Sequence, residues 1–329
     1  MKKALIIGIS GQDGSYLAKL LIEKGYKVWG TSRDAQISSF HNLDYLGIRE
    51  QVRVESMSLN DFRSVIQVLS KIKPDEIYNL AGQTSVGLSF EQPVETFESI
   101  SIGTLNLLET LRFLKSSSRL YNASSSECFG NTNGEAATEQ TPFKPRSPYA
   151  AAKAAAFWQT ANYREAYGIF ACSGILFNHE SPLRPKRFVT QKIVKTAVDI
   201  AAGRASELYL GNINIARDWG WAPEYVEAIW LMLQQEQPED YIVATGKTYC
   251  LREFVQEVFS YLDLNWQKYT SSDAELLRPT DILESRAEPS KAKRTLGWEA
   301  KYDMLDVARM MVEVELSEQN TSRMRSEKL

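Results

Sequence analysis

The first half of the chain alternates short apolar runs, rich in β-branched residues, with longer amphipathic stretches. This pattern is typical of a parallel sheet with helices on both faces. It predicts strands at residues 4–8, 27–32, 53–56, 76–80, 119–123 and 170–176. Helices are predicted at residues 15–24, 62–71, 104–114 and 149–167, with Asn60 or Asp61 as the cap of the second.

Beyond Phe177 the regular alternation ends, and prolines separate mixed helices and short strands, for example at 207–210 and 241–244. We therefore expect a Rossmann-type doubly wound α/β domain over residues 1–177 and a smaller α/β substrate-binding domain over 178–316. The two should share packing, with exchange of segments between them left open, because no linker separates them. Residues 317–329 are polar and are expected to form a frayed tail.

Composition narrows the class of protein. The 329 residues are 43% hydrophobic and 24% charged, as in an ordinary globular protein. A net charge of −3 and a pI near 5.7 do not favour a nucleic-acid partner. Cys128, Cys172 and Cys250 have no CxxC spacing and are expected to be reduced; with only His41 and His179 beside them, no metal site is predicted. The N-terminal apolar run is too short for a signal peptide or membrane span, so a cytoplasmic protein without a membrane partner is expected.

A glycine-rich turn follows the first predicted strand. Small residues there allow the backbone to approach a pyrophosphate at the N-terminus of the next helix. Elsewhere such a turn is often only a connection, but at the start of an α/β pattern it predicts dinucleotide binding. Its GxxGxxG spacing is similar to that of short-chain dehydrogenases/reductases. The residues predicted to bind the cofactor here are Gly8, Ser10, Gly11, Gln12, Asp13 and Gly14.

Arg33 follows the second predicted strand, where an acidic residue would hold the ribose of NAD. A guanidinium suits the additional phosphate of NADP, which is therefore the predicted cofactor. The adjacent Asp34 leaves NAD open, because a carboxylate can repel that phosphate or bind a ribose. Leu80, Ala81 and Gln83 end the fourth strand and are expected near the inner ribose and phosphates.

Four residues after the fifth strand supply catalytic chemistry: Ser125, Glu127, Tyr149 and Lys153. A tyrosine four positions before a lysine shares its helix face, where the ammonium can favour the phenolate as a base. The serine, tyrosine and lysine suffice for alcohol oxidation; Glu127 adds a base for a carbon next to a new ketone. Each residue alone arises easily by chance, but their joint order after the glycine-rich turn favours an active site.

Longer segments carry a more specific resemblance. They include GISGQDGSYLA from residue 8, SFEQP from 89, PRSPY from 145, NYREAYG from 162, GILFNHESP from 174 and RDWG from 217. These segments resemble the GDP-mannose 4,6-dehydratase family of extended short-chain dehydrogenases/reductases, with matches from residue 5 to about residue 315.

The resemblance implies conversion of GDP-mannose to GDP-4-keto-6-deoxymannose, with NADP held throughout and a homodimer or homotetramer as the assembly. Tyr149, helped by Lys153, would take the C4 hydroxyl proton as hydride passes to the nicotinamide. Glu127 would take the C5 proton while water leaves C6 with help from Ser125, and hydride would return to C6.

The same resemblance assigns binding residues. Cofactor contacts would include Ser58, Leu59, His179 and Arg184, together with Tyr149 and Lys153. Arginines suit a diphosphate because their planar forks match its oxygens. The GDP-sugar would meet Ser85, Ser125, Glu127, Asn178, Val189, Lys192, Leu210, Gly211, Arg217, Arg278 and Asp281.

Departures from the family pattern gather around the cofactor. The family has Arg-Arg at Arg33-Asp34, aspartate at Ser58, tyrosine at Glu95 and an acidic residue at Ile100; it also has arginine at Gln191, threonine at Ser125 and glutamate at Asp281. These differences bear on cofactor affinity, the choice between NADP and NAD, and assembly rather than on the reaction type.

Two other functions stay open at this point. A nucleotide-sugar epimerase or reductase of the same fold would use Tyr149 and Lys153 without Glu127, and a catalytically weak NADP-binding sensor would need none of them. The sequence also leaves open whether the sugar is a mannose or a heptose, and whether the assembly is a dimer or a tetramer.

Overall fold

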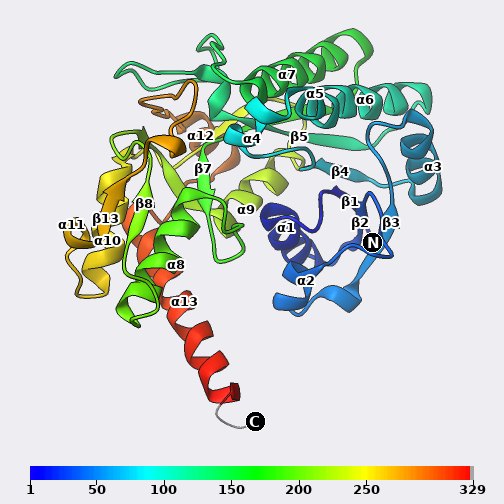
Figure 1. Ribbon diagram of the computed structural model, residues 1–329. Coiled ribbons are helices and arrows are strands. Elements are labelled where there is room, and N and C mark those ends of the chain that lie inside the picture. Colours follow the sequence, from blue (N-terminus) through cyan, green and yellow to red (C-terminus); the bar gives the residue numbers. More distant parts are fainter. Residues whose placement is uncertain (327–329) are drawn as a thin grey trace.

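A seven-stranded parallel sheet forms the centre of the computed structural model, which describes residues 1–326, with side chains as far as residue 320 (Figure 1). The strand order is β11-β6-β5-β4-β1-β2-β3. Six strands come from the first half and confirm the predicted ones to within two residues. The strands are β1 (Lys3–Ile7), β2 (Lys27–Ser32), β3 (Val52–Ser56), β4 (Glu76–Asn79), β5 (Arg119–Ser125), β6 (Ala171–Leu176) and β11 (Tyr241–Val243).

Helices cover both faces of this sheet. One face carries α1 (Gln12–Glu23), α2 (His41–Tyr45) and α9 (Ala222–Met232), whose apolar side chains pack in one core with those of β1 and β2. The other carries α3 (Phe62–Ile72), α6 (Gly103–Phe113) and α7 (Pro148–Tyr167) (Figure 1). Two further helices, α4 (Val86–Glu91) and α5 (Pro93–Phe97), and the π-helical turn η2 (Glu98–Ile102) precede α6.

Local sequence signals explain where the main helices begin. Asp61, one of the two predicted caps, accepts a hydrogen bond from the Arg63 amide at the start of α3. Ser147 caps α7 in the same way, with Pro148 at its first position. α7 ends at Gly168, whose φ of 65° is left-handed. These limits place Tyr149 in the first turn of α7, over the end of β5.

The second half builds another core beside the carboxyl edge of the sheet. Its main helices are α8 (Val189–Ala201), α10 (Leu251–Tyr261) and α13 (Met304–Ser326), which pack around β8 (Leu208–Leu210). Short strand pairs complete it: β7 (Asn178–Glu180) with β10 (Trp219–Trp221), β9 (Ala216–Arg217) with β12 (Tyr249–Cys250), and β8 with β13 (Thr270–Ser272). The remaining elements are α11 (Trp266–Tyr269), α12 (Ser290–Leu296) and the 3-10 turns η1 (Arg49–Gln51), η3 (Ser126–Phe129) and η4 (Ala274–Leu276).

Two segments of the second half return to the sheet. β11 pairs with β6, and α9 packs against α1, so the chain crosses between the two cores more than once. The frayed tail expected from residue 317 is instead helical to Ser326, because no proline or glycine interrupts α13. The expected tail also includes residues 327–329, which lie outside the part of the chain that the structure describes.

No helix within residues 1–326 combines the length and the apolar composition that crossing a bilayer requires. Within the same residues, no group of three or more histidine, cysteine, aspartate or glutamate side chains has the arrangement of a metal site.

Candidate active site

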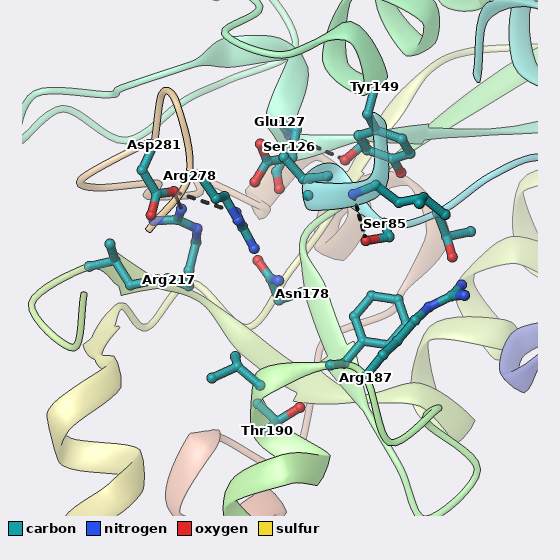
Figure 2. Close-up of a pocket in the computed structure, with 18 of the residues that line it drawn as sticks. Ser85, Ser126, Glu127, Tyr149, Asn178, Arg187, Thr190, Arg217, Arg278 and Asp281 are labelled. Atoms are coloured by element: carbon teal, nitrogen blue, oxygen red, sulfur yellow. Dashed lines mark hydrogen bonds and ion pairs between the residues drawn. The ribbon is translucent and has the colours of Figure 1, made fainter. Parts of the chain in front are cut away.

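A cavity of about 750 Å³ lies at the carboxyl ends of β4, β5 and β6, facing the second core (Figure 2). Parallel sheets commonly bind ligands at this edge. The structure brings to its wall all four predicted catalytic residues and all eleven residues assigned to the GDP-sugar. From the cofactor set, the wall includes Asp13, Leu80, Tyr149, Lys153, His179 and Arg184.

The four predicted catalytic residues come from consecutive elements. Ser125 ends β5, Glu127 lies in η3, and Tyr149 and Lys153 lie one helical turn apart in α7. Ser125 Oγ accepts a hydrogen bond from the Glu127 amide at 3.2 Å. Lys153 Nζ donates to the Ala123 carbonyl at 2.8 Å and lies 5.9 Å from the centroid of the Tyr149 ring. The main chain of β5 therefore fixes the lysine beside the tyrosine.

Burial dominates the electrostatics of these groups. It raises the pKa of Tyr149, opposed by a hydrogen bond with Ser125, and it lowers the pKa of Lys153 to about 8. The structure differs here from the expected stabilisation of a phenolate, because the ammonium is directed at a carbonyl. Burial likewise raises the pKa of Glu127, while Arg217 and Arg278 oppose that rise. Glu127 therefore has the basicity to accept and hold a proton.

The glycine-rich turn fits a pyrophosphate. Gly8 has φ of +89°, and a Cβ added to it would lie 3.0 Å from the Ala81 nitrogen. A Cβ on Gly14 would come within 2.3 Å of the Gly8 carbonyl oxygen. Gly11 precedes α1 without any side-chain cap, so the first amides of that helix are left for an anion.

Gln12 and Asp13 tie this turn to the end of β6. His179 Nε2 lies 3.0 Å from Asp13 Oδ2, and its Nδ1 lies 2.7 Å from the Phe177 carbonyl oxygen. Gln12 Nε2 donates both to Asp13 Oδ1 and to the His179 carbonyl. Both His179 nitrogens are thus engaged within the protein, so its ring supports the turn rather than offering a free donor to a cofactor.

Arg33 and Asp34 differ in how they are held. Asp34 Oδ1 accepts hydrogen bonds from the amides of Gln36 and Ile37, which closes the turn after β2. Arg33 is exposed and has no hydrogen bond or ion pair within residues 1–326. The carboxylate is therefore occupied by its own loop, whereas the guanidinium is free.

The remaining cofactor predictions lie along the same edge of the sheet. Ser58 follows β3, where its amide donates to Ser64 Oγ. Gln83 Nε2 donates to the Ser85 carbonyl and to Thr96 Oγ1, so this side chain is held by α4 and α5. The residues that do not reach the cavity wall are Gly8, Ser10, Gly11, Gln12, Gly14, Arg33, Ser58, Leu59, Ala81 and Gln83.

On the substrate side, Arg217 and Arg278 meet at one carboxylate (Figure 2). Asp281 Oδ1 lies 3.4 Å from a guanidinium nitrogen of each. Asp281, one of the residues assigned to the GDP-sugar, orders the two arginines through this oxygen. Only 4% of the Arg217 side chain is exposed, which makes this charge a strong anchor for an anion entering the cavity.

The other predicted substrate residues frame the opposite wall. Val189 begins α8, which has no side-chain cap, and Lys192 Nζ donates to the Tyr209 carbonyl at 2.7 Å. Gly211 follows β8, and a Cβ there would lie 2.9 Å from the Leu276 carbonyl oxygen. The segment that carries Arg278 therefore packs closely on β8.

Sequence reasoning missed several residues of the wall. Glu180 is buried and holds Arg184 Nε at 3.2 Å and Thr190 Oγ1 at 2.7 Å. It joins a predicted cofactor residue to the first turn of α8. Its place in the GILFNHESP segment was the only available signal. Ser126 and Arg187 also line the cavity, and no sequence pattern distinguished them.

Comparisons with known proteins extend over nearly the whole chain. A family model described as GDP-mannose 4,6 dehydratase matches residues 5–311. GDP-mannose 4,6 dehydratase 1 of Arabidopsis thaliana is 45% identical over 325 residues, covering 96% of this chain and 90% of that protein. GDP-mannose 4,6-dehydratase of Yersinia enterocolitica is 41% identical over 352 aligned positions, covering 97% and 95%. A solved Thermus thermophilus UDP-glucose 4-epimerase in complex with NAD has a TM-score of 0.83 at 26% identity, covering 95% and 98%.

Proposed function

The chain belongs to the GDP-mannose 4,6-dehydratase family, and we propose that it converts GDP-mannose to GDP-4-keto-6-deoxymannose and water. The observation that carries this proposal is the position of Glu127. A partly buried carboxylate lines the same cavity as Tyr149 and Lys153, within reach of the charges of Arg217 and Arg278. Oxidation and elimination can therefore take place on one bound sugar.

Tyr149 is placed to take the proton of the C4 hydroxyl. Its pKa is raised by burial, so the proton moves as C4 is oxidised rather than beforehand. Ser125 opposes the rise in the pKa of the same tyrosine, and Lys153 is held beside it by the Ala123 carbonyl. When bound, a nicotinamide dinucleotide supplies temporary storage for the hydride that leaves C4 and returns to C6.

Glu127 then takes the proton at C5, which the neighbouring C4 ketone has made acidic. The raised pKa strengthens this carboxylate as a base, while the charges of the two arginines favour its ionised form. Loss of the C6 hydroxyl as water completes the elimination. An epimerase or reductase that acts only at C4 has no step that requires such a base.

The residues present fit a dinucleotide cofactor, and Arg33 supports NADP. Gly8, Gly14 and the uncapped start of α1 would hold the pyrophosphate. The free Arg33 guanidinium would meet the additional phosphate of NADP, since Asp34 is occupied by its own turn. The Thermus thermophilus epimerase complex contains NAD, so the preference for NADP rests on Arg33.

The GDP moiety would lie between α8 and the segment that carries Arg278. Arg217 and Arg278 would hold the diphosphate, with the uncapped first turn of α8 on the other side. Lys192, Leu210 and Gly211 would line the nucleoside end. This places the hexose next to Glu127 and Tyr149.

Incubation of the purified protein with GDP-mannose and NADP, followed by mass analysis, tests the function. We expect the sugar nucleotide to lose the mass of one water without net consumption of cofactor. An unchanged mass, with a GDP-heptose as a second substrate also unchanged, would contradict a 4,6-dehydratase.

The variant Glu127→Gln tests the mechanism. We expect dehydration to fall by roughly 10²- to 10⁴-fold, the usual contribution of a general base, while C4 oxidation continues and reduced nicotinamide accumulates. Glu135→Gln, an exposed glutamate outside the cavity wall, is the matched control. Full dehydration by Glu127→Gln would exclude this residue as the C5 base.

Apolar side chains on α5, η2 and α7 support a helix-paired homodimer. Val94, Phe97, Ile102 and Trp158 are exposed there, with Trp158 at 62% and Val94 at 68%. The three elements pack against one another and form one face of the molecule (Figure 1). Pairing of this face with a second copy would bury these side chains.

A further inference from the structure

Three consecutive serines close the wall of the cavity beside Glu127, and their hydroxyls are engaged differently. Ser124 Oγ lies 3.8 Å from Cys128 Sγ. Ser125 Oγ accepts a hydrogen bond from the Glu127 amide, and the Ser125 hydroxyl opposes the rise that burial causes in the pKa of Tyr149. Ser126 is buried at 4% exposure and lines the cavity, yet within residues 1–326 its hydroxyl has no hydrogen-bond partner.

This difference matters because the proposed elimination needs two proton transfers at different carbons. At C4, Tyr149 takes the hydroxyl proton with help from Ser125. The C6 oxygen must also be protonated, because hydroxide is a poor leaving group and water is a good one. Ser125 already accepts the Glu127 amide at the start of η3 and acts on Tyr149, whereas the Ser126 hydroxyl beside Glu127 is free to bridge from that carboxyl group to the C6 oxygen.

Resting on the function proposed above, we propose that Ser126 donates a hydrogen bond to the C6 hydroxyl and relays to it the proton that Glu127 takes from C5. Figure 2 shows Ser126 next to Glu127, the two side by side at the cavity. Their positions are fixed by the first turn of η3, which begins at Ser126.

The relay balances without any other reactant. The C5–H bond breaks and its proton passes to the Glu127 carboxylate, while the electron pair forms the C5–C6 double bond. The C6–O bond breaks as Ser126 gives its hydroxyl proton to the leaving oxygen. Ser126 then recovers a proton from Glu127, so both residues return to their starting state and one water is released.

The variant Ser126→Ala, assayed with GDP-mannose and with GDP-6-deoxy-6-fluoromannose, tests this role. Fluoride leaves without being protonated, so a lost proton donor matters less for the fluoro substrate. We expect about 100-fold slower elimination from GDP-mannose, the lower part of the range for proton-transfer catalysis, with accumulation of reduced nicotinamide. Elimination of fluoride should stay within a few-fold of the unmodified enzyme.

Two variants control this experiment. Ser206→Ala removes an exposed hydroxyl outside the cavity wall and should keep nearly full activity on both substrates. Ser126→Thr keeps the hydroxyl and should retain most of the rate on GDP-mannose. This variant still tests the role of the hydroxyl if the Ser126→Ala protein folds poorly.

The outcomes separate the two proposals. Equal slowing of Ser126→Ala on both substrates, or no slowing on either, would overturn a role at the C6 oxygen. Failure of the unmodified protein to release water from GDP-mannose would instead overturn the proposed function.

Discussion

His179 shows how one residue can link the cofactor turn to the substrate core. Its ring joins Asp13 in the first turn of α1 to the main chain at Phe177, and it stacks on Tyr225 with ring centroids 4.6 Å apart. The Asp13 carboxylate raises the pKa of His179, although burial and Arg184 oppose it. The partnership in turn lowers the pKa of Asp13 to about 2.

These shifts predict a pH-dependent contribution to stability. A histidine with a raised folded pKa stabilises the fold fully below its unfolded value of about 6.5, and this is lost as the pH rises through the folded value. Asp13 stays ionised throughout this pH range because its pKa is about 2. Its contribution to stability is lost only as the pH falls through that value. We expect His179→Asn to lower the free energy of unfolding by about 3 kcal/mol near pH 6 and by less at high pH.

Chemical denaturation of both proteins across this pH range measures the effect. His41→Asn, which changes the exposed histidine, is the control and should leave the pH dependence unaltered. The same pH dependence in the unmodified protein and in His179→Asn would contradict an ionised pair.

Arg33 and Asp34 make a second prediction for single residues. Replacing Arg33 with Gln should weaken NADP binding by about 10- to 100-fold, the value of a charge-assisted hydrogen bond, and leave NAD binding nearly unchanged. Asp34→Asn is the matched control, because its amide oxygen can still accept from Gln36 and Ile37. Titration of each protein with both cofactors gives the dissociation constants, and equal weakening of NADP and NAD would count against Arg33 as the phosphate ligand.

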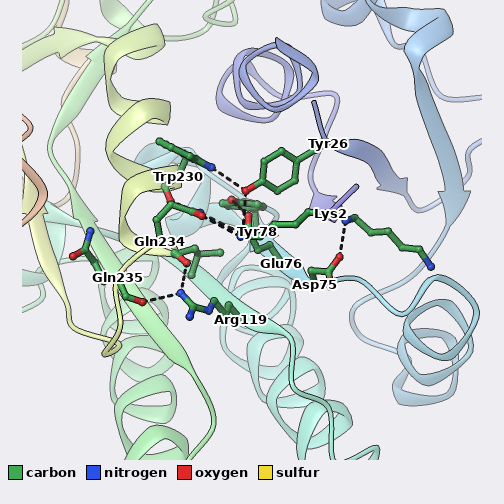
Figure 3. Close-up of polar contacts among 11 residues, drawn as sticks. Lys2, Tyr26, Asp75, Glu76, Tyr78, Arg119, Trp230, Gln234 and Gln235 are labelled. Atoms are coloured by element: carbon green, nitrogen blue, oxygen red, sulfur yellow. Dashed lines mark hydrogen bonds and ion pairs between the residues drawn. The ribbon is translucent and has the colours of Figure 1, made fainter. Parts of the chain in front are cut away.

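At the scale of elements, α9 is fixed to the amino edge of the sheet, opposite the cavity (Figure 3). Glu76, which is 1% exposed, accepts hydrogen bonds from Lys2, Tyr26, Tyr78 and Gln234. Arg119 donates to the Leu233 and Gln235 carbonyls, both at 2.7 Å, just after the end of α9. A guanidinium at this end satisfies unpaired carbonyls and favours the helix dipole.

Replacement of Arg119 by Met therefore tests the anchoring of α9. The methionine keeps an apolar stem near Phe170, whose ring centroid lies 4.4 Å from the guanidinium carbon. We expect a loss of about 1–3 kcal/mol in the free energy of unfolding, as for other hydrogen bonds to charged groups. The exposed Arg112→Met, which breaks a surface pair with Glu109, should cost clearly less, because solvent screens that pair. Thermal denaturation compares the two, and a similar loss in both would contradict a specific role for Arg119.

Long elements could be predicted from the sequence, and so could two short strands, β8 and β11, at 207–210 and 241–244; the other short elements could not. The central strands are buried on both faces, so each gives an apolar run that is easily recognised. β7, β9, β10, β12 and β13 have only two or three residues each, too few for any periodicity. Helices as short as α2 and α5 are equally hard to predict, because packing rather than propensity stabilises them.

The same limit applies to the site. The catalytic quartet could be listed because its members lie close together in the sequence. The pairing of Asp13 with His179 joins residues 166 positions apart, and only the folded chain reveals it. Asp281 was assigned to the GDP-sugar from the sequence. The ion pairs of its Oδ1 with Arg217 and Arg278 are again visible only in the folded chain.

For the whole molecule, the exposed face of α5, η2 and α7 predicts the assembly. Trp158→Glu should convert a homodimer into monomers, because a buried unpaired charge at the centre of an interface is costly. Sedimentation velocity measures the change. Tyr302→Glu, at an exposed aromatic residue of the second half, should leave the assembly intact. A monomeric unmodified protein would contradict the homodimer, and an unchanged dimer after Trp158→Glu would place its interface elsewhere.

The position of β11 in the sheet also sets an order for biosynthesis. β6 reaches its place when residue 176 has been made, but the strand beside it ends at Val243. While the intervening chain is being translated, the β6 edge stays unpaired, and α1 lacks α9 over its apolar side. A fragment ending at residue 177 would keep both surfaces exposed, so we expect it to aggregate rather than fold as a cofactor-binding unit. The growing chain would depend on chaperones until β11 has been made.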